Sequence, residues 1–180
     1  MELVIAQLKE GENPFTFSSV NDAWMAEIIT DVEKQGYRLK SPLTSELSLV
    51  NSEPEYYLTG KLHFDVEQSC SRCADNFKLH IDHPFHVSLV HIANYKAKIK
   101  ENADNDTDLD VNFFEGNEIN LAPLLEEQFF LSIPYQVVCK DNCQGICQHC
   151  GKNLNEASCN CATKGDETSP FAVLRNLPTH

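Results

Sequence analysis

Apolar and polar residues alternate along three stretches of the chain, at residues 43–50, 58–66 and 77–89. A period of two places successive side chains on opposite faces, so each stretch is predicted to be a strand with one buried face and one face in water. Such strands are typical of an antiparallel sheet. Pro84 interrupts the third stretch and predicts an edge strand or a bulge, because proline cannot donate to the ladder. A weaker alternation at residues 3–8 predicts a further short strand.

A different spacing predicts a helix over residues 19–34. Apolar residues recur there at every fourth position and form one stripe, which consists of Val20, Trp24, Ile28 and Val32. Ser19 with Asp22 three residues later matches the pattern of a capping box, and Gly36 is placed to end the helix. We expect Trp24 to serve packing and not to hold a cofactor.

A second helix is predicted over residues 120–131. Asn120 is a suitable N-cap, and Pro123 is tolerated in the first helical turn. Leucine and phenylalanine side chains lie on one side and glutamates on the other. Pro134 then stops the helix.

These elements predict an α+β fold, in which a mainly antiparallel sheet is packed by two helices and carries a small cysteine-rich C-terminal module. We expect residues 1–100 to form an α+β body with a CxxC motif in a hairpin. Residues 101–118 are expected to be an acidic linker. Residues 119–180 would then contain the second helix, the cysteine-rich module and the tail.

The predicted linker at 101–118 contains seven acidic residues and no lysine or arginine. A solvated linker is the favoured interpretation of such a run. The alternative is an acidic segment that docks on a basic partner.

The charge of the whole chain limits its partners. The formal net charge is −13, and an acidic chain repels the phosphates of RNA at long range. An RNA-related role must therefore be indirect, depend on a local patch, or act through a basic protein. The N-terminus has no basic start, and no apolar run reaches the length of about 18–20 residues that spans a bilayer, so we expect a cytoplasmic protein without a membrane partner.

Eight cysteines are the main candidates for chemistry: Cys70, Cys73, Cys139, Cys143, Cys147, Cys150, Cys159 and Cys161. Thiols stay reduced in the cytosol, where clustered cysteines bind metal more often than they form disulfides. Cys70 and Cys73 form a CxxC motif between two predicted strands, and Cys147 and Cys150 form a second CxxC motif followed by Gly151. Tight turns of this kind bring two thiolates onto one zinc ion, and glycine adopts the positive φ that the turn favours.

Eight thiolates suit two structural Zn²⁺ sites with four ligands each. The preferred grouping joins Cys70, Cys73, Cys139 and Cys143 in one site and Cys147, Cys150, Cys159 and Cys161 in the other. The rival grouping is a single site made of both CxxC motifs, with four free thiols. Four thiolates leave no position for a water molecule, so both sites are expected to be structural and not catalytic.

Other polar groups offer weaker candidates. A redox CxxC motif normally opens a helix, whereas a predicted strand follows Cys73. His80 and His86 share a strand face but lie about 20 Å apart, and His83 points to the other face, so solvated histidines are the better interpretation. His149 lies between two cysteines and is an alternative ligand to one thiolate. We find no phosphate-binding loop, catalytic residue or small-molecule site.

Five segments together resemble the YceD-like family of large ribosomal RNA subunit accumulation proteins. They are Cys70-Ser-Arg-Cys73, the stretch 124–134, the stretch 143–155, Cys159-Asn-Cys161 and the closing Pro170-Phe-Ala-Val-Leu174. The resemblance extends from about residue 40 to the end, and the C-terminal cysteines are its most specific part. It implies a role in the synthesis, processing or stability of 23S rRNA, with no known catalytic activity.

We therefore expect a ribosome-biogenesis factor that acts by binding, not an enzyme. Its expected partner is a ribosomal protein or assembly factor, and a basic one suits the charge best; direct contact with rRNA is left open. Two other classes stay open at this point: a zinc-stabilised adaptor in protein interactions, and a thiol-redox protein that uses Cys70 and Cys73.

Overall fold

The computed structural model describes residues 1–52, 55–95 and 111–161 and divides the chain into two compact units. The first unit, called the body here, comprises Met1–Gln68 and Lys78–Tyr135. The second, called the cysteine module, comprises Ser69–Phe77 and Gln136–His180. The predicted division differs in two respects: the hairpin tip belongs to the cysteine module, and the second helix belongs to the body.

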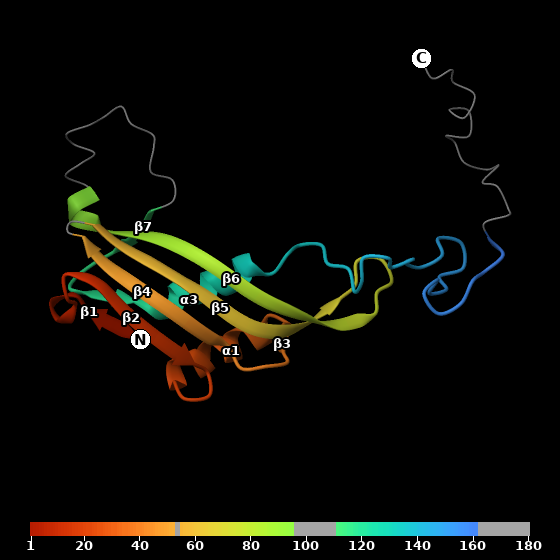
Figure 1. The fold of residues 1–180 in the computed structure, drawn as a ribbon, viewed down its shortest axis with the longest axis horizontal. Coiled ribbons are helices and arrows are strands. Elements are labelled where there is room, and N and C mark those ends of the chain that lie inside the picture. Colours follow the sequence, from red (N-terminus) through yellow and green to blue (C-terminus); the bar gives the residue numbers. More distant parts are fainter. Residues whose placement is uncertain (53–54, 96–110, 162–180) are drawn as a thin grey trace, which may run out of the picture. The chain divides into compact units, whose positions relative to one another are not determined.

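The body is built on a mostly antiparallel sheet, which confirms the predicted α+β class (Figure 1). Its strand order is β2 (Gly11–Ser18), β4 (Thr44–Ser52), β5 (Glu55–Ser69), β6 (Asn76–His91) and β7 (Val111–Phe114). The short strand β3 (Arg38–Leu39) pairs with β5, and β7 runs parallel to β6. A separate two-stranded sheet joins β1 (Glu2–Val4) to β8 (Glu118–Asn120).

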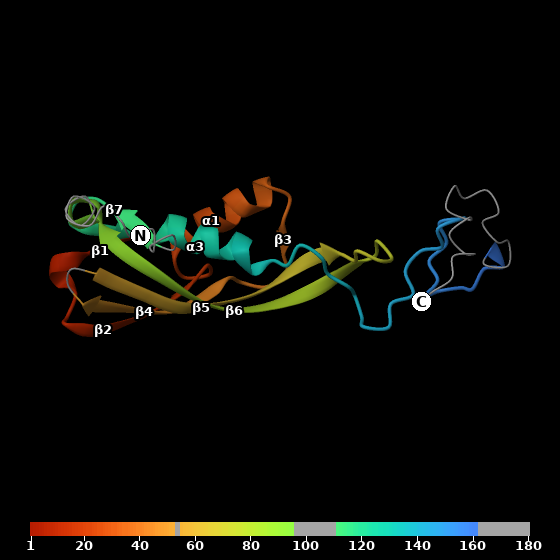
Figure 2. The same cartoon turned by 90° about the horizontal axis from the view of Figure 1, so that it is seen from above.

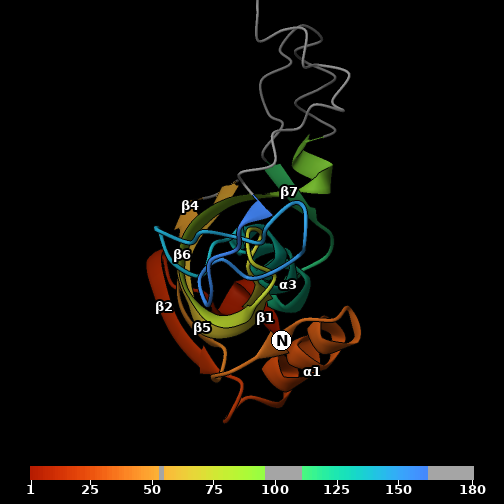
Figure 3. The same cartoon turned by 90° about the vertical axis from the view of Figure 1, so that its right-hand side faces the viewer.

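Two helices cover one face of this sheet, as Figures 2 and 3 show from two directions. Helix α1 (Ala23–Lys34) and helix α3 (Leu121–Ser132) each bury one side. The alternate residues of β5 that face them are also buried, among them Leu58, Leu62 and Phe64. Phe64 stacks on Phe129 with ring centroids 4.5 Å apart, so the core lies between the sheet and the helices.

Helix α3 begins as predicted, because the Asn120 side chain accepts a hydrogen bond from the Ala122 N–H at 3.1 Å. The capping box predicted at Ser19 is wrong. Helix α1 begins at Ala23 with Asp22 as its N-cap, and the Ser19 hydroxyl instead accepts a hydrogen bond from the Leu43 N–H at 3.1 Å. Ser19 ties the end of β2 to the start of β4, so it is unavailable to the helix.

Sequence patterns missed β2 because only Phe15 and Phe17 alternate clearly within it. Strand β2 is instead stabilised by hydrogen bonds with β4 along its full length. The predicted acidic linker also differs: its residues 111–114 form β7 and its last residue begins β8, whereas residues 101–110 lie outside the described part. Both short strands are stabilised by pairing with strands distant in the sequence, β7 with β6 and β8 with β1.

The strand predicted at residues 3–8 is shorter, with β1 followed by a 3₁₀ turn at Ile5–Gln7. Pro84 lies within β6, where the pairing with β7 covers only Ser88–His91, so Pro84 occupies an edge segment among the described residues. No helix in the described part of the chain is long and apolar enough to cross a membrane.

Candidate metal centres

All eight cysteines lie in the cysteine module, and their sulfurs gather in two groups of four. Site 1 contains Cys70, Cys73, Cys139 and Cys143, and site 2 contains Cys147, Cys150, Cys159 and Cys161. Within each group all four sulfurs lie within 4.8 Å of one another. This is the grouping that the sequence favoured; the rival set of both CxxC motifs is not brought together among the described residues.

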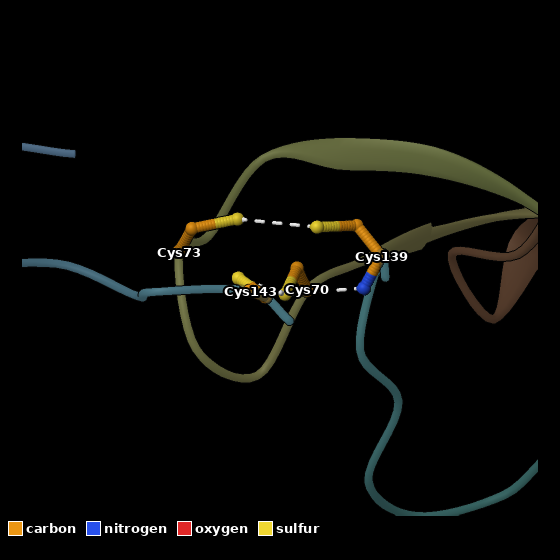
Figure 4. A group of neighbouring side chains, drawn as sticks. All are labelled: Cys70, Cys73, Cys139 and Cys143. Atoms are coloured by element: carbon orange, nitrogen blue, oxygen red, sulfur yellow. Dashed lines mark hydrogen bonds between the residues drawn. The ribbon is translucent and has the colours of Figure 1, made fainter. Parts of the chain in front are cut away.

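The spacing of the sulfurs in site 1 matches a tetrahedral zinc centre (Figure 4). Cys70 Sγ lies 3.8 Å from Cys143 Sγ, and Cys73 Sγ lies 3.7 Å from Cys139 Sγ. A Zn–S bond of about 2.3 Å gives a tetrahedron whose sulfur–sulfur edge is about 3.8 Å. A disulfide would bring two sulfurs to about 2.05 Å, and all eight cysteines are free thiols. The donor set and its spacing therefore fit Zn²⁺.

The first CxxC motif forms a closed turn at the tip of the β5–β6 hairpin. The Cys70 N–H donates to the Asp75 carbonyl at 2.9 Å, and the Ala74 N–H donates to the Cys70 carbonyl at 2.9 Å. The Arg72 N–H donates to Cys70 Sγ at 3.4 Å. Ala74 has a φ of 61°, in the left-handed region, so the turn closes at a cost in backbone strain.

The second CxxC motif repeats this turn. The Cys147 N–H donates to the Lys152 carbonyl at 2.8 Å, and the Gly151 N–H donates to the Cys147 carbonyl at 2.9 Å. Gly151 has a φ of 71° and occupies the position that Ala74 holds in the first turn. We call these two turns, residues 70–75 and 147–152, the first and second knuckles. Two segments with the same pattern of hydrogen bonds therefore each present two sulfurs on one side.

The other two ligands of site 1 come from the segment that begins the C-terminal part of the module. The Ser71 N–H donates to the Val137 carbonyl at 2.8 Å, and the Val137 N–H donates to the Ser71 hydroxyl at 3.2 Å. The Cys139 N–H then donates to Cys70 Sγ at 3.3 Å. These bonds align the segment with the first knuckle, so that Cys139 and Cys143 reach the same centre.

Arg72 forms hydrogen bonds with residues 141–146, further along the segment that contains Cys139 and Cys143. Its guanidinium donates to the carbonyls of Asp141 and Cys143, and its own carbonyl accepts from the Ile146 N–H at 3.0 Å. Gly145 lies directly against it: a Cβ added there would stand 3.0 Å from the Arg72 carbonyl oxygen. Only glycine fits this position without displacement, and its φ of 74° is also in the left-handed region.

Crowding of four thiols separates their pKa values. Burial opposes ionisation of Cys70, but backbone N–H donors, first that of Cys73, lower its pKa to about 6. In site 2 the Cys150 N–H makes the largest contribution to lowering the pKa of Cys147 to about 6. A hydrogen bond with Cys150 raises the pKa of Cys161 to about 12. The pKa of Cys143 in site 1 is lowered as well, first by the hydrogen bond from the Asn155 amide. Each site therefore holds at least one thiol whose pKa lies below its usual value, which favours the thiolate form that binds metal.

The two sites differ in exposure. In site 1 three of the four cysteines are buried and the fourth is half-buried, whereas in site 2 Cys147 is buried, Cys150 is exposed and the other two are half-buried. Site 1 is thus closed to solvent on most sides. Neither group of four thiols offers an open position for a reacting water molecule, so both have the composition of structural centres.

Histidines contribute little to these centres. His149 is exposed and is not part of either group of sulfurs. His80 and His86 are exposed on β6, where His80 Nδ1 lies 2.8 Å from an Asp65 oxygen and His86 stacks on Tyr57. His83 is half-buried in the same strand. No metal cluster forms from these histidines among the described residues.

Sequence reasoning missed the polar residues that support the thiolates. The Asn155 amide nitrogen donates to Cys143 Sγ at 3.3 Å, and the Asn153 amide nitrogen donates to Asp75 at 2.6 Å. The sequence shows only that two asparagines follow the second knuckle, in a loop where asparagine is common. Their contact with residues far along the chain has no local signal.

Comparison with known proteins identifies one family. The model described as "Large ribosomal RNA subunit accumulation protein YceD" matches residues 58–178. The matched region begins in β5 and contains all eight cysteine positions. No curated protein and no solved structure gives a significant match to the chain.

Proposed function

Because this chain belongs to the YceD family of large ribosomal RNA subunit accumulation proteins, we propose that it supports the synthesis, processing or stability of 23S rRNA by binding a partner and not by catalysis. The family match over residues 58–178 is the observation that carries the proposal. It spans more than half of the chain and includes both knuckles. The role in rRNA accumulation follows from the family, and the binding mechanism is our own proposal.

Zn²⁺ is the proposed occupant of both sites. Site 1 would hold it with Cys70, Cys73, Cys139 and Cys143, and site 2 with Cys147, Cys150, Cys159 and Cys161. The sulfur–sulfur distances of 3.7 and 3.8 Å in site 1 support this identity, as does a donor set made only of thiolates. At each site the ion would offset the negative charge of the thiolates. At site 1 it would also hold Ser69–Phe77 to the C-terminal segment of the module.

A basic protein in the cytoplasm, such as a ribosomal protein or assembly factor, is the proposed partner. The net charge of −13 favours a positively charged surface and opposes tight binding to rRNA by charge alone. Complementary charge would steer such a partner to the chain and select against acidic competitors. Direct contact with rRNA is not required by this proposal.

A thiol-redox function for Cys70 and Cys73 has less support. Their side chains are 3% and 4% exposed, whereas reactive cysteines lie in accessible positions. The motif lies between β5 and β6 and closes a hairpin, whereas a redox CxxC motif normally opens a helix. An adaptor role outside ribosome assembly would use the same zinc-stabilised module, and the experiment below separates it from the proposed one.

The test is deletion of the gene followed by sucrose-gradient analysis of ribosomes and measurement of 23S rRNA. Deletion is expected to reduce large subunits and mature 23S rRNA, and the intact chain is expected to restore both. A Cys70→Ser/Cys73→Ser double variant is expected not to restore them, whereas Gln144→Ala, at an exposed position outside both ligand sets, serves as the matched control. An unchanged gradient and unchanged rRNA in the deletion strain would contradict the proposal and favour an unrelated adaptor.

A further inference from the structure

The residues that follow the second knuckle contact the segment before Cys147, next to site 1. Immediately after Lys152, Asn153 forms a β-bridge with Ile146, and the Leu154 N–H donates to the Gly145 carbonyl at 2.9 Å. These contacts return residues 153–155 to the segment that precedes Cys147. The second knuckle therefore closes a loop whose end lies beside the last ligand of site 1.

Asn155 makes the connection to a ligand. Its amide nitrogen donates to Cys143 Sγ at 3.3 Å, while its amide oxygen accepts from the Gln144 N–H at 2.9 Å. The nitrogen and the oxygen of the Asn155 amide thus form hydrogen bonds with Cys143 and Gln144, respectively. An N–H donor to a ligating sulfur stabilises the thiolate and fixes its direction.

Asn153 makes the connection to the first knuckle. Its amide nitrogen donates to the Asp75 carboxylate at 2.6 Å, and its amide oxygen accepts from both the backbone N–H and the side-chain amide of Asn155. Asp75 is the residue whose carbonyl closes the first knuckle on Cys70. One polar chain therefore runs from the second knuckle through Asn153 and Asn155 to both halves of site 1.

We propose that this asparagine pair couples the two sites, so that site 1 reaches its full affinity for Zn²⁺ only when the second knuckle is held by metal at site 2. Asn155 is then a positioning residue, since it acts on the metal through Cys143. The inference rests on the proposed binding of Zn²⁺ at both sites and adds that the two binding events depend on each other.

The physical basis is the loss of order in an unloaded site 2. Without an ion to hold Cys147 and Cys150 to the more distant Cys159 and Cys161, the loop of residues 147–155 loses its main constraint. Asn155 and Asn153 must then be ordered at the moment when site 1 binds its ion, and that cost lowers the affinity of site 1. Loss of a partner that supports a ligand lowers metal affinity by about 10- to 100-fold, which sets the expected coupling.

Native mass spectrometry of the full chain with one equivalent of Zn²⁺ tests the coupling directly. When two tight sites are independent, the singly loaded form makes up at least half of the molecules, whatever their two affinities. A coupling of about 10- to 100-fold between sites of similar affinity lowers that form to about a quarter to a tenth, with apo and doubly loaded chains in its place. The single-site affinities from the second measurement below give the distribution expected for independent sites. A wild-type singly loaded form at or above that expected value would overturn the proposal.

Two variants locate the coupling. Asn155→Asp keeps the shape of the side chain and an oxygen for the Gln144 N–H, but it replaces the donor to Cys143 with a carboxylate oxygen. The singly loaded form is expected to rise to half or more in this variant. Gln144→Ala is the matched control, since the Gln144 side chain donates only to the exposed Asn142 carbonyl, and it is expected to keep the wild-type distribution. A wild-type distribution in Asn155→Asp would overturn the role of Asn155.

A second measurement does not depend on that variant. Cys150→Ser/Cys161→Ser removes site 2, and competition with a chromophoric chelator then gives the Zn²⁺ affinity of site 1. We expect it to be about 10- to 100-fold below the affinity of site 1 in the doubly loaded chain. Cys73→Ser/Cys139→Ser is expected to weaken site 2 by the same factor, because coupling is reciprocal. Unchanged affinities would overturn the coupling alone, whereas a wild-type chain that binds no Zn²⁺ would overturn the proposed metal sites as well.

Discussion

The body and the cysteine module are ordered by different physical means. In the body a continuous set of buried apolar side chains from β4, β5, β6, α1 and α3 forms one core. In the module the buried cluster consists of Cys70, Cys73 and Cys143, with Phe77 and Cys139 packed against it. Apolar burial is non-directional and spread over many contacts, whereas the module depends on a few directed hydrogen bonds and on its thiolates. Loss of a single interaction should therefore weaken the body without disordering it, whereas loss of a bound ion should disorder the module.

Metal removal should give the largest separation between the two units. Structural zinc contributes about 10 kcal/mol or more to the folding of modules of this size. A strong chelator is therefore expected to unfold residues 70–75 and 139–161 while the sheet of the body stays folded. Hydrogen exchange followed by mass spectrometry would show this as fast exchange in the module and unchanged protection in β4 and β5. Restored protection after addition of Zn²⁺ is the control, and protection of both knuckles in the metal-free chain would contradict the comparison.

Truncation of a core side chain should lower the stability of the body and leave the cysteine module unchanged. Phe129 is fully buried and stacks on Phe64, so Phe129→Ala is expected to lower the free energy of unfolding of the body by about 3–5 kcal/mol. Chemical denaturation measures this loss. Leu131→Ala on the same helix is the matched control, because that side chain is 64% exposed, and its effect is expected to stay within about 0.5 kcal/mol.

The same pair also tests whether the units are independent in metal binding. Zinc stoichiometry is expected to stay at two ions per chain in both variants, since none of the eight ligands belongs to the body. A loss of zinc in Phe129→Ala at temperatures where the variant stays folded would show that the core of the body also orders the module.

Sequence patterns predicted most of the body because its long elements carry strong local signals. The alternation along β5 and β6 and the asparagine cap of α3 are written in neighbouring residues, so they were visible without the structure. Strand β2 was not visible, since its order comes from pairing with β4, whose partner residues lie 26 to 40 positions away. Asp22 replaced Ser19 as the cap of α1 for the same reason: the Ser19 hydroxyl is used by Leu43.

The grouping of the eight cysteines followed from chemistry as much as from pattern. Each CxxC turn supplies two thiolates, and the chain contains two further pairs of cysteines, so the sequence suggests two centres of four thiolates. The sulfurs do gather in two such groups. The support given by Asn155 to Cys143 and by Asn153 to Asp75 had no such signal. Hydrogen bonds between side chains distant in sequence depend on the folded geometry, and a single sequence does not reveal them.

Gly145 provides a test of close packing inside the module. Gly145→Ala places a Cβ 3.0 Å from the Arg72 carbonyl and requires an alanine at a φ of 74°. The two effects together are expected to cost about 2 kcal/mol or more, which corresponds to a loss of about thirtyfold or more in Zn²⁺ affinity at site 1. Chelator competition measures this affinity. Gly116→Ala is the matched control: Gly116 also has a positive φ, but it belongs to the body, so Zn²⁺ affinity is expected not to change.

The smallest expected effects compare the two knuckles with each other. Ala74 and Gly151 occupy equivalent positions with φ values of 61° and 71°, and no atom lies within 4 Å of a Cβ added at Gly151. Ala74→Gly relieves the strain of a left-handed alanine and is expected to strengthen the first knuckle by about 0.5–1 kcal/mol. Gly151→Ala introduces the same strain and is expected to weaken the second knuckle by about 1 kcal/mol. Chelator competition in both single variants measures the two shifts, and shifts of the same sign would show that the two turns are not equivalent.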